Sequence, residues 1–173
     1  MGKMNILIGD ITTDEILKNH DCIVNPTNPA MRMGMGVSGA IFKKAGVQVL
    51  EAYTSEKYHI TYDSNANEMK VGEIRITPGF NLNMDILFVQ GPRVWDYKNP
   101  LEILKITYQN LLDELGVKSY KNILLPSIGT GEYGFTHEEV GPMLKNMIRD
   151  FVKNHDINID LILYESEVKK YYE

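Results

Sequence analysis

The chain has 173 residues, of which 43% are hydrophobic and 24% are charged. This length suffices for one domain with a hydrophobic core and is too short for two domains of ordinary size, so we expect a single domain over residues 1–173. The formal net charge is -5 and the Lys and Arg residues are scattered among acidic ones, which argues against duplex nucleic acid as a partner because neutralising phosphates needs clustered cations.

Short aliphatic or β-branched runs alternate with longer segments of helical periodicity along the chain. This alternation is typical of strands joined by helices around a largely parallel or mixed sheet. The predicted strands are Met4–Ile8, Cys22–Asn25, Ile74–Thr77, Ile86–Gln90, Ile123–Leu125 and Ile159–Leu163. Most of these runs are apolar throughout, as expected of strands that are covered on both faces.

Helical periodicity predicts helices between these strands and after the last one. They cover Val37–Ala45, Val47 to about Ser55, Leu101–Leu115, His137–Asn154 and a short terminal segment, Glu165–Tyr172. Gly116 is expected to end the third of them. Thr136 followed by Glu139 three positions later predicts a capping box at the start of the fourth. The polar segment 62–70 is predicted to be an exposed loop within the same domain.

The first chemically informative segment is a buried strand followed by a glycine-spaced loop and a helix, between Cys22 and Gly46. We expect Gly34, Gly36 and Gly39 to let the backbone approach a ligand, because they have no Cβ atom. The N–H groups that open the next helix favour an anion. This segment therefore predicts an anion-binding site of a generic kind, while a glycine-rich turn that serves packing alone is the simpler alternative.

A second segment of the same kind runs from Leu124 to Val140. Its glycines and hydroxyl residues, from Ser127 to Gly134, follow a buried strand, and ligands of open α/β sheets bind at the carboxyl ends of strands. Two such loops weaken the alternative of packing alone and predict a clamp around a pyrophosphate.

Four motifs then point to one family. They are GDIT at residues 9–12, IVNPTN followed by GMGVSGAIFKKAG, VGEIRITPGFNL followed by FVQGPRVW, and LPSIGTGEYGF. In this order, and over nearly the whole chain, they resemble the macrodomain family. The resemblance implies a three-layer α/β/α fold with a mixed central sheet and a cleft that binds ADP-ribose or an ADP-ribosylated target.

The resemblance also implies individual ligand contacts. Asp10 matches the acid that accepts a hydrogen bond from the adenine amino group, with the backbone N–H of Ile11 beside it, and Tyr164 matches a position whose ring stacks on adenine. The Asn28 amide matches the group that binds the distal ribose, and Tyr133 the aromatic residue that covers that ribose. The two phosphate-binding loops of the family correspond to Gly36, Val37, Ser38, Ser127, Gly129, Thr130, Gly131, Glu132 and Tyr133.

Some of these residues also fit structural roles. Asp10 could cap a helix near Thr13 or form a turn, and Tyr164 could cover the edge of the core. Asn25 and Asn28 would be turn formers without the family context, and within it Asn25 is expected to brace the loop.

The resemblance leaves two activities open. Hydrolases of the family carry an acid in the first glycine loop where this chain has Ser38, and a serine hydroxyl is no general base near neutral pH without a partner. We therefore expect an ADP-ribose-binding module first. The alternative is an ADP-ribosyl hydrolase or O-acetyl-ADP-ribose deacetylase that acts in the same cleft through Asn28, a bound water and the ligand's own phosphate. A nucleotide or nucleic-acid binder that shares only the fold is a third reading, which the acidic pI disfavours.

Neither a metal nor another cofactor is expected, because Cys22 is the single cysteine and the histidines form no cluster with it. Its apolar surroundings predict a buried thiol. No apolar run has the length of a bilayer span and the chain does not open like a signal peptide, so a cytoplasmic location is expected.

Overall fold

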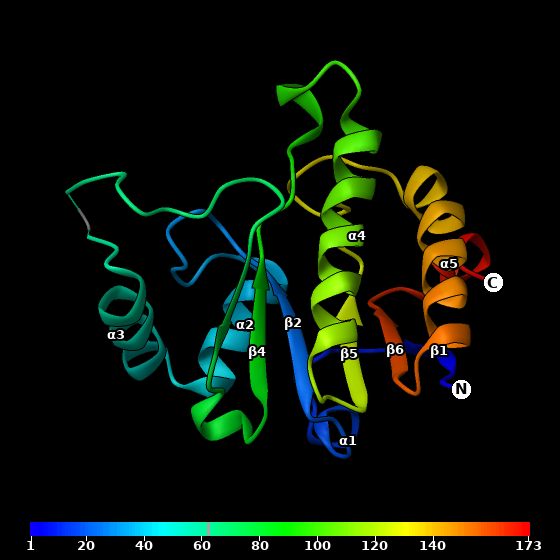
Figure 1. Cartoon of the computed structure of the whole chain (residues 1–173), viewed down its shortest axis with the longest axis horizontal. Helices are drawn as coiled ribbons and strands as arrows, with labels where there is room; N and C mark the ends of the chain where they lie inside the picture. Colours follow the sequence, from blue (N-terminus) through cyan, green and yellow to red (C-terminus); the bar gives the residue numbers. More distant parts are fainter. Residues whose placement is uncertain (62) are drawn as a thin grey trace.

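A six-stranded mixed sheet lies at the centre of the structure, in the order β1-β6-β5-β2-β4-β3 (Figure 1). Its strands are β1 (Met4–Ile8), β2 (Cys22–Pro26), β3 (Ile74–Thr77), β4 (Asp85–Val89), β5 (Asn122–Pro126) and β6 (Asn158–Leu163). Only β3 runs antiparallel to its neighbour among the strands described. This computed structural model describes residues 1–61 and 63–173, so Tyr62, at the start of the predicted loop, lies outside the described residues.

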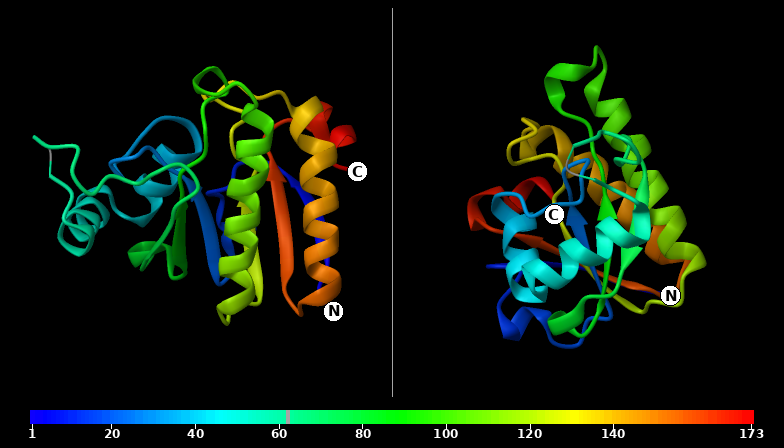
Figure 2. Two further views of the ribbon diagram at one scale, coloured as in Figure 1. Left: turned by 45° about the horizontal axis from the view of Figure 1, so that its top comes forward. Right: turned by 90° about the vertical axis from the view of Figure 1, so that its left-hand side faces the viewer.

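Helices cover both faces of the sheet, which confirms the three-layer prediction (Figures 1 and 2). The helices are α1 (Asp14–Leu17), α2 (Gly36–Ala45), α3 (Val47–Tyr58), α4 (Pro100–Val117) and α5 (His137–Asn154). Alternation along the strands divides the core in two. Val24 belongs to the cluster formed with α4 and α5, whereas its neighbour Ile23 packs with α2 on the other face. Cys22 is fully buried, as predicted, and its burial raises the pKa of its thiol.

The predicted strands agree with the structure to within one residue at each end, and the helices agree less closely. The four-residue α1 was not predicted, and the terminal segment forms a 3-10 helix, η3 (Ser166–Tyr171). Two further 3-10 turns, η1 (Phe80–Leu82) and η2 (Val94–Asp96), were also missed. None of the helices in the described part of the chain is both long and apolar enough to cross a membrane.

Gly116 does not end its helix, contrary to the prediction, because α4 continues to Val117. The position serves close packing instead. A Cβ atom there would lie 3.0 Å from Nε2 of His155, beyond the end of α5. Glycine is therefore explained by a neighbour that is remote in the sequence, rather than by a left-handed cap.

The start of α5 has the predicted capping box. The N–H of Glu139 donates to Oγ1 of Thr136 over 3.2 Å, and the N–H of Thr136 donates to Oε2 of Glu139 over 3.0 Å. The box satisfies two N–H groups that a helix start leaves without partners. It fixes the direction in which the chain leaves the second glycine-rich loop.

His20 and Asp160, which lies on β6, form a partly buried hydrogen-bonded pair. Nε2 of His20 is 2.8 Å from Oδ2 of Asp160, and Nδ2 of Asn5 donates to the other carboxylate oxygen over 2.9 Å. The side chains of His20 and Asp160 are only 6% and 22% exposed. The hydrogen bond to Asp160 raises the pKa of His20, and the hydrogen bond from His20 lowers the pKa of Asp160.

We expect Asp160→Asn to destabilise the fold in a pH-dependent manner. The raised pKa of His20 stabilises the folded state below the unfolded His pKa of about 6.5, and this contribution is lost as the pH rises through the folded value. The lowered pKa of Asp160 stabilises the folded state above the ordinary Asp pKa of about 3.8, and this contribution is lost as the pH falls through the folded value. The variant should therefore lose about 1 to 3 kcal/mol of unfolding free energy near pH 5.5, and less above pH 8.

Urea denaturation at both pH values measures this difference. Asp156→Asn is the matched control, because the Asp156 side chain is 78% exposed and its ion pairs are long. Equal losses at the two pH values would contradict the assignment.

Candidate functional site

The two glycine-rich loops meet at one end of the sheet, as predicted. They follow β2 and β5, which are parallel neighbours, so both leave the sheet at its carboxyl edge (Figure 1). A cavity of about 330 Å³ lies between them. Of the predicted site residues, those that line it are Asn28, Gly36, Val37, Ser38, Ser127, Gly129, Gly131, Glu132 and Tyr133. Asp10, Ile11, Thr130 and Tyr164 are not part of the lining.

The first loop delivers the start of α2 to the cavity. Gly36 adopts a left-handed φ of +61°, and its N-cap residue, Met35, makes no side-chain capping bond. The first N–H groups of a helix have no acceptor within that helix. Those of Gly36, Val37 and Ser38 are thus left for another acceptor, at the end of the helix where the macrodipole is positive.

Gly39 is required for a different reason from the one expected. A Cβ atom at this position would lie 2.4 Å from the carbonyl oxygen of Gly34. The absence of that atom lets the loop close onto its own helix, rather than letting a ligand approach. Beyond its own segment, Gly36 by contrast has no atom of the described residues within 4 Å of where a Cβ atom would be.

The second loop folds back on itself and leaves its middle N–H groups unused. Gly134 donates to the carbonyl of Gly131 over 3.2 Å, and Phe135 donates to that of Gly129 over 3.0 Å. Within residues 1–61 and 63–173, the N–H groups from Gly129 to Tyr133 have no protein acceptor. These are the backbone donors that the sequence placed in this loop.

The two asparagines behave differently from each other. Oδ1 of Asn28 accepts from the N–H of Arg32 over 3.1 Å, and its Nδ2 donates to the Arg32 carbonyl over 2.9 Å. The second hydrogen on Nδ2 is not used by this pair of bonds. Asn25 was expected to brace the loop, and this is wrong. It is fully buried on β2, and neither polar atom of its side chain has a partner among the described residues.

Ser38 stands at the position where hydrolases of the resembled family carry an acid. Its side chain is only 6% exposed, and its hydroxyl has no hydrogen-bond partner within the described residues. No side chain that the structure describes is therefore placed to remove the Ser38 proton.

Asp10 forms a turn at its own position in the chain. Oδ1 accepts from both the N–H and the hydroxyl of Thr12, over 2.8 Å and 2.7 Å. These bonds, the backbone bond first, lower the pKa of the exposed carboxyl group. Thr13, not Asp10, is the N-cap of α1. Of the two structural roles considered for Asp10, the turn is the one observed, and contact with adenine stays a prediction.

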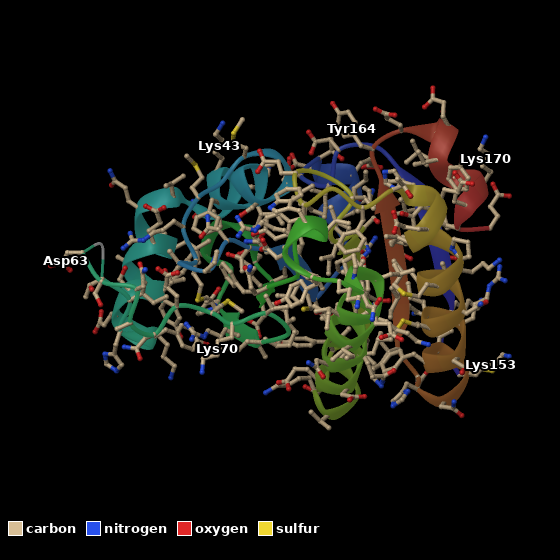
Figure 3. The ribbon with its side chains drawn as sticks, turned by 90° about the horizontal axis from the view of Figure 1, so that it is seen from above. Lys43, Asp63, Lys70, Lys153, Tyr164 and Lys170 are labelled. Atoms are coloured by element: carbon tan, nitrogen blue, oxygen red, sulfur yellow. The ribbon has the colours of Figure 1, made fainter. Side chains whose placement is uncertain are left out.

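Tyr164 lies directly after β6 and is 80% exposed. Figure 3 shows it at the edge of the molecule, on the same side of the view as Lys43 of α2. This exposure rules out the alternative in which Tyr164 covers the edge of the core. Its ring is free to stack on a ligand, and that role also stays a prediction.

Several cavity residues escaped the sequence reasoning. Thr27, Gly91 and Ile128 also line the cavity. Gly91 follows β4, the other neighbour of β2, so the signal was a glycine after a third parallel strand. Ile128 is apolar and 1% exposed, and nothing in its type points to a binding site.

The comparisons with known proteins agree with this geometry. A family model described as Macro domain matches residues 24–144. A macro domain-containing protein of Vibrio parahaemolyticus is 32% identical over 140 residues, 80% of this chain and 77% of that protein. An O-acetyl-ADP-ribose deacetylase of Citrobacter rodentium is 29% identical over 176 residues, 99% of this chain and 93% of that protein. A solved mutant of the Oceanobacillus iheyensis macrodomain with ADPR has a TM-score of 0.80 and 30% identity, over 96% of this chain and 88% of that one.

Proposed function

Because the chain belongs to the Macro domain family, we propose that its cleft binds ADP-ribose, either free or attached to an ADP-ribosylated target. The observation that carries this proposal is the pair of opposed loops. Each loop presents backbone N–H groups without a protein acceptor among the described residues, and both border the same cavity. A diphosphate supplies the acceptors that two such rows of donors require.

The remaining ligand contacts follow from this placement of the diphosphate. On the side of Asn28 and Tyr133, which line the cavity, the distal ribose would meet the free N–H of the amide and the tyrosine ring. The adenine would lie towards Asp10, the Ile11 N–H and Tyr164, outside the enclosed part of the cleft. Stacking on an exposed tyrosine contributes about 1 to 3 kcal/mol per base in nucleic-acid complexes.

A second candidate function is hydrolysis in the same cleft. It is favoured by a likeness over 99% of the chain to a protein named O-acetyl-ADP-ribose deacetylase. The unpartnered Ser38 hydroxyl gives it no general base, so water would be oriented by Asn28 and activated by the ligand's own phosphate. Binding is thus the better supported function, and turnover is a separate question for experiment.

We expect calorimetry to show micromolar affinity for ADP-ribose, a binding free energy of roughly -8 kcal/mol. AMP should bind at least about tenfold more weakly, because it has one phosphate and no distal ribose to occupy the first loop. Equal affinities for the two ligands would show that the glycine loops make no contribution, and no binding of either would refute the proposal.

The same samples test turnover. Wild type and Asn28→Ala are incubated with O-acetyl-ADP-ribose and with a mono-ADP-ribosylated protein, and the released products are measured. Hydrolysis by the wild type that disappears in a variant still able to bind ADP-ribose would establish the second function. Binding without product release would establish the module as a reader of its ligand.

A further inference from the structure

Two buried tyrosine hydroxyls form hydrogen bonds with the start of the second glycine loop. Tyr108 of α4 accepts from the N–H of Ile128 over 2.6 Å and donates to the Ile128 carbonyl over 3.3 Å. Tyr172, beyond η3, has its hydroxyl 2.7 Å from Oγ of Ser127 and 2.7 Å from Nδ1 of His137. Both tyrosine side chains are 0% exposed. Ser127 itself lines the cavity, so the second contact reaches the cleft directly.

Residues 171–173 pack against α5 through specific contacts. A Cβ atom at Gly141 would lie 2.4 Å from the carbonyl oxygen of Tyr171, so a glycine in the helix makes room for η3. Nζ of Lys145 donates to the carbonyl of Glu173 over 2.9 Å. The ring of His137 meets that of Tyr172 edge-on, with centroids 5.8 Å apart. The place of Tyr172 behind the loop is therefore determined by the fold.

Ser127, Tyr172 and His137 form a row of three hydrogen-bonding groups that has two possible arrangements of its protons. The Tyr172 hydroxyl has one proton and two neighbours, so it donates to one and accepts from the other. When Tyr172 donates to His137, the Ser127 proton is used on Tyr172 and Ser127 offers only lone pairs to the cleft. When Nδ1 of His137 carries a proton, Tyr172 donates to Ser127, and the Ser127 proton is free for an acceptor in the cleft.

The protonation states of His137 and Tyr172 allow the second arrangement without a buried charge. Partial burial lowers the pKa of His137, against the opposing effect of Glu165, so the imidazole is neutral near pH 7 and can carry its proton on Nδ1. Burial raises the pKa of Tyr172 to about 12, so its hydroxyl keeps its proton. An anionic ligand beside Ser127 then selects the arrangement that offers it a donor.

We propose that Tyr172 is a positioning residue of the cleft, which fixes the second glycine loop through Ser127 and turns the Ser127 proton towards an anionic ligand. This inference rests on the proposed function in naming ADP-ribose as that ligand. It makes Tyr172 a determinant of the binding site, although Tyr172 is not among the residues that line the cavity.

The test compares Tyr172→Phe with Tyr171→Phe. Phenylalanine keeps the buried ring and removes only the hydroxyl. Tyr171 is the adjacent residue, and its hydroxyl has no hydrogen bond within the described part of the chain. By calorimetry, Tyr172→Phe should bind ADP-ribose about tenfold more weakly and Tyr171→Phe within about twofold of wild type. Equal affinities of the two variants would overturn the inference.

A double-mutant cycle separates positioning from general loss of stability. If Tyr172 acts through Ser127, then Tyr172→Phe should change affinity by less than about twofold in a Ser127→Ala background. If Tyr172→Phe weakened ADP-ribose binding by the same factor in both backgrounds, Tyr172 would only stabilise the folded protein. That result would overturn its role at Ser127.

Amide hydrogen exchange without ligand distinguishes failure of this inference from failure of the proposed function. The backbone amides of residues 127–134 should exchange faster in Tyr172→Phe than in Tyr171→Phe, because the loop loses the hydrogen bond between Ser127 and Tyr172. If the wild type bound no ADP-ribose, the proposed function would fall while faster exchange would still support the loop-fixing role. Unchanged exchange would overturn that role whatever the ligand.

Discussion

Gly39→Ala should weaken ADP-ribose binding on the order of a hundredfold, because it forces the first glycine loop away from α2. The added Cβ atom would lie 2.4 Å from the Gly34 carbonyl oxygen, and this neighbour is backbone, which cannot rotate away as a side chain can. Moving Gly34 also moves Gly36 and the N–H groups that we place against the diphosphate. Overpacking of this kind further costs about 1 to 3 kcal/mol of stability.

Gly39→Ala is expected to destabilise the protein, which is the opposite of the usual effect of this substitution in a helix. In a helix without such a contact, replacing glycine by alanine stabilises by about 1 kcal/mol. Gly131→Ala serves as the control for folding, since no atom of the described residues, apart from its own and those of its two chain neighbours, lies within 4 Å of its would-be Cβ atom and its φ is not left-handed. Urea denaturation of both variants measures the change in stability, and calorimetry of Gly39→Ala measures the change in affinity for ADP-ribose. A Gly39→Ala protein that is as stable as wild type and binds normally would refute the assigned contact.

Tyr108→Phe should lower the free energy of unfolding by about 2 to 4 kcal/mol. The ring would stay in place, but the hydroxyl that bonds both polar groups of the Ile128 backbone would be gone. Tyr108 and Ile128 are 0% and 1% exposed, so water cannot replace it without opening the core. The N–H and carbonyl of Ile128 would each be left buried without a partner.

Urea denaturation measures this loss of unfolding free energy. The m-value, the slope of the unfolding free energy against urea concentration, is expected to stay unchanged. Tyr97→Phe is the control, because Tyr97 is 37% exposed and its hydroxyl makes no hydrogen bond to any described residue. A loss below about 0.5 kcal/mol in Tyr108→Phe would show that the Ile128 groups find other partners.

The strands and the two loops followed from local sequence. A short apolar run buried on both faces is a property of consecutive residues, so the strand limits were predicted closely. The capping box was predicted for the same reason, since Thr136 and Glu139 are three positions apart. Both loops were placed correctly at one edge of the sheet, because the strands before them are parallel.

Only the tertiary structure assigned the contacts of individual side chains. The prediction of a bracing role for Asn25 failed because a buried amide depends on groups brought near it by other strands. Gly116 and Gly141 are explained by His155 and Tyr171, which no pattern around either glycine reveals.

The cleft between the two glycine-rich loops shows the same division. Its backbone donors were determined by the sequence alone, because glycine spacing and the start of a helix decide which N–H groups lack partners. The groups that hold those donors in place were decided by the fold. Ser127 and Tyr172 are 45 positions apart, and their hydroxyls meet only because α5 and η3 return the end of the chain to the loop. Local sequence specifies conformation, whereas a hydrogen bond between distant residues requires the packing that brings them together.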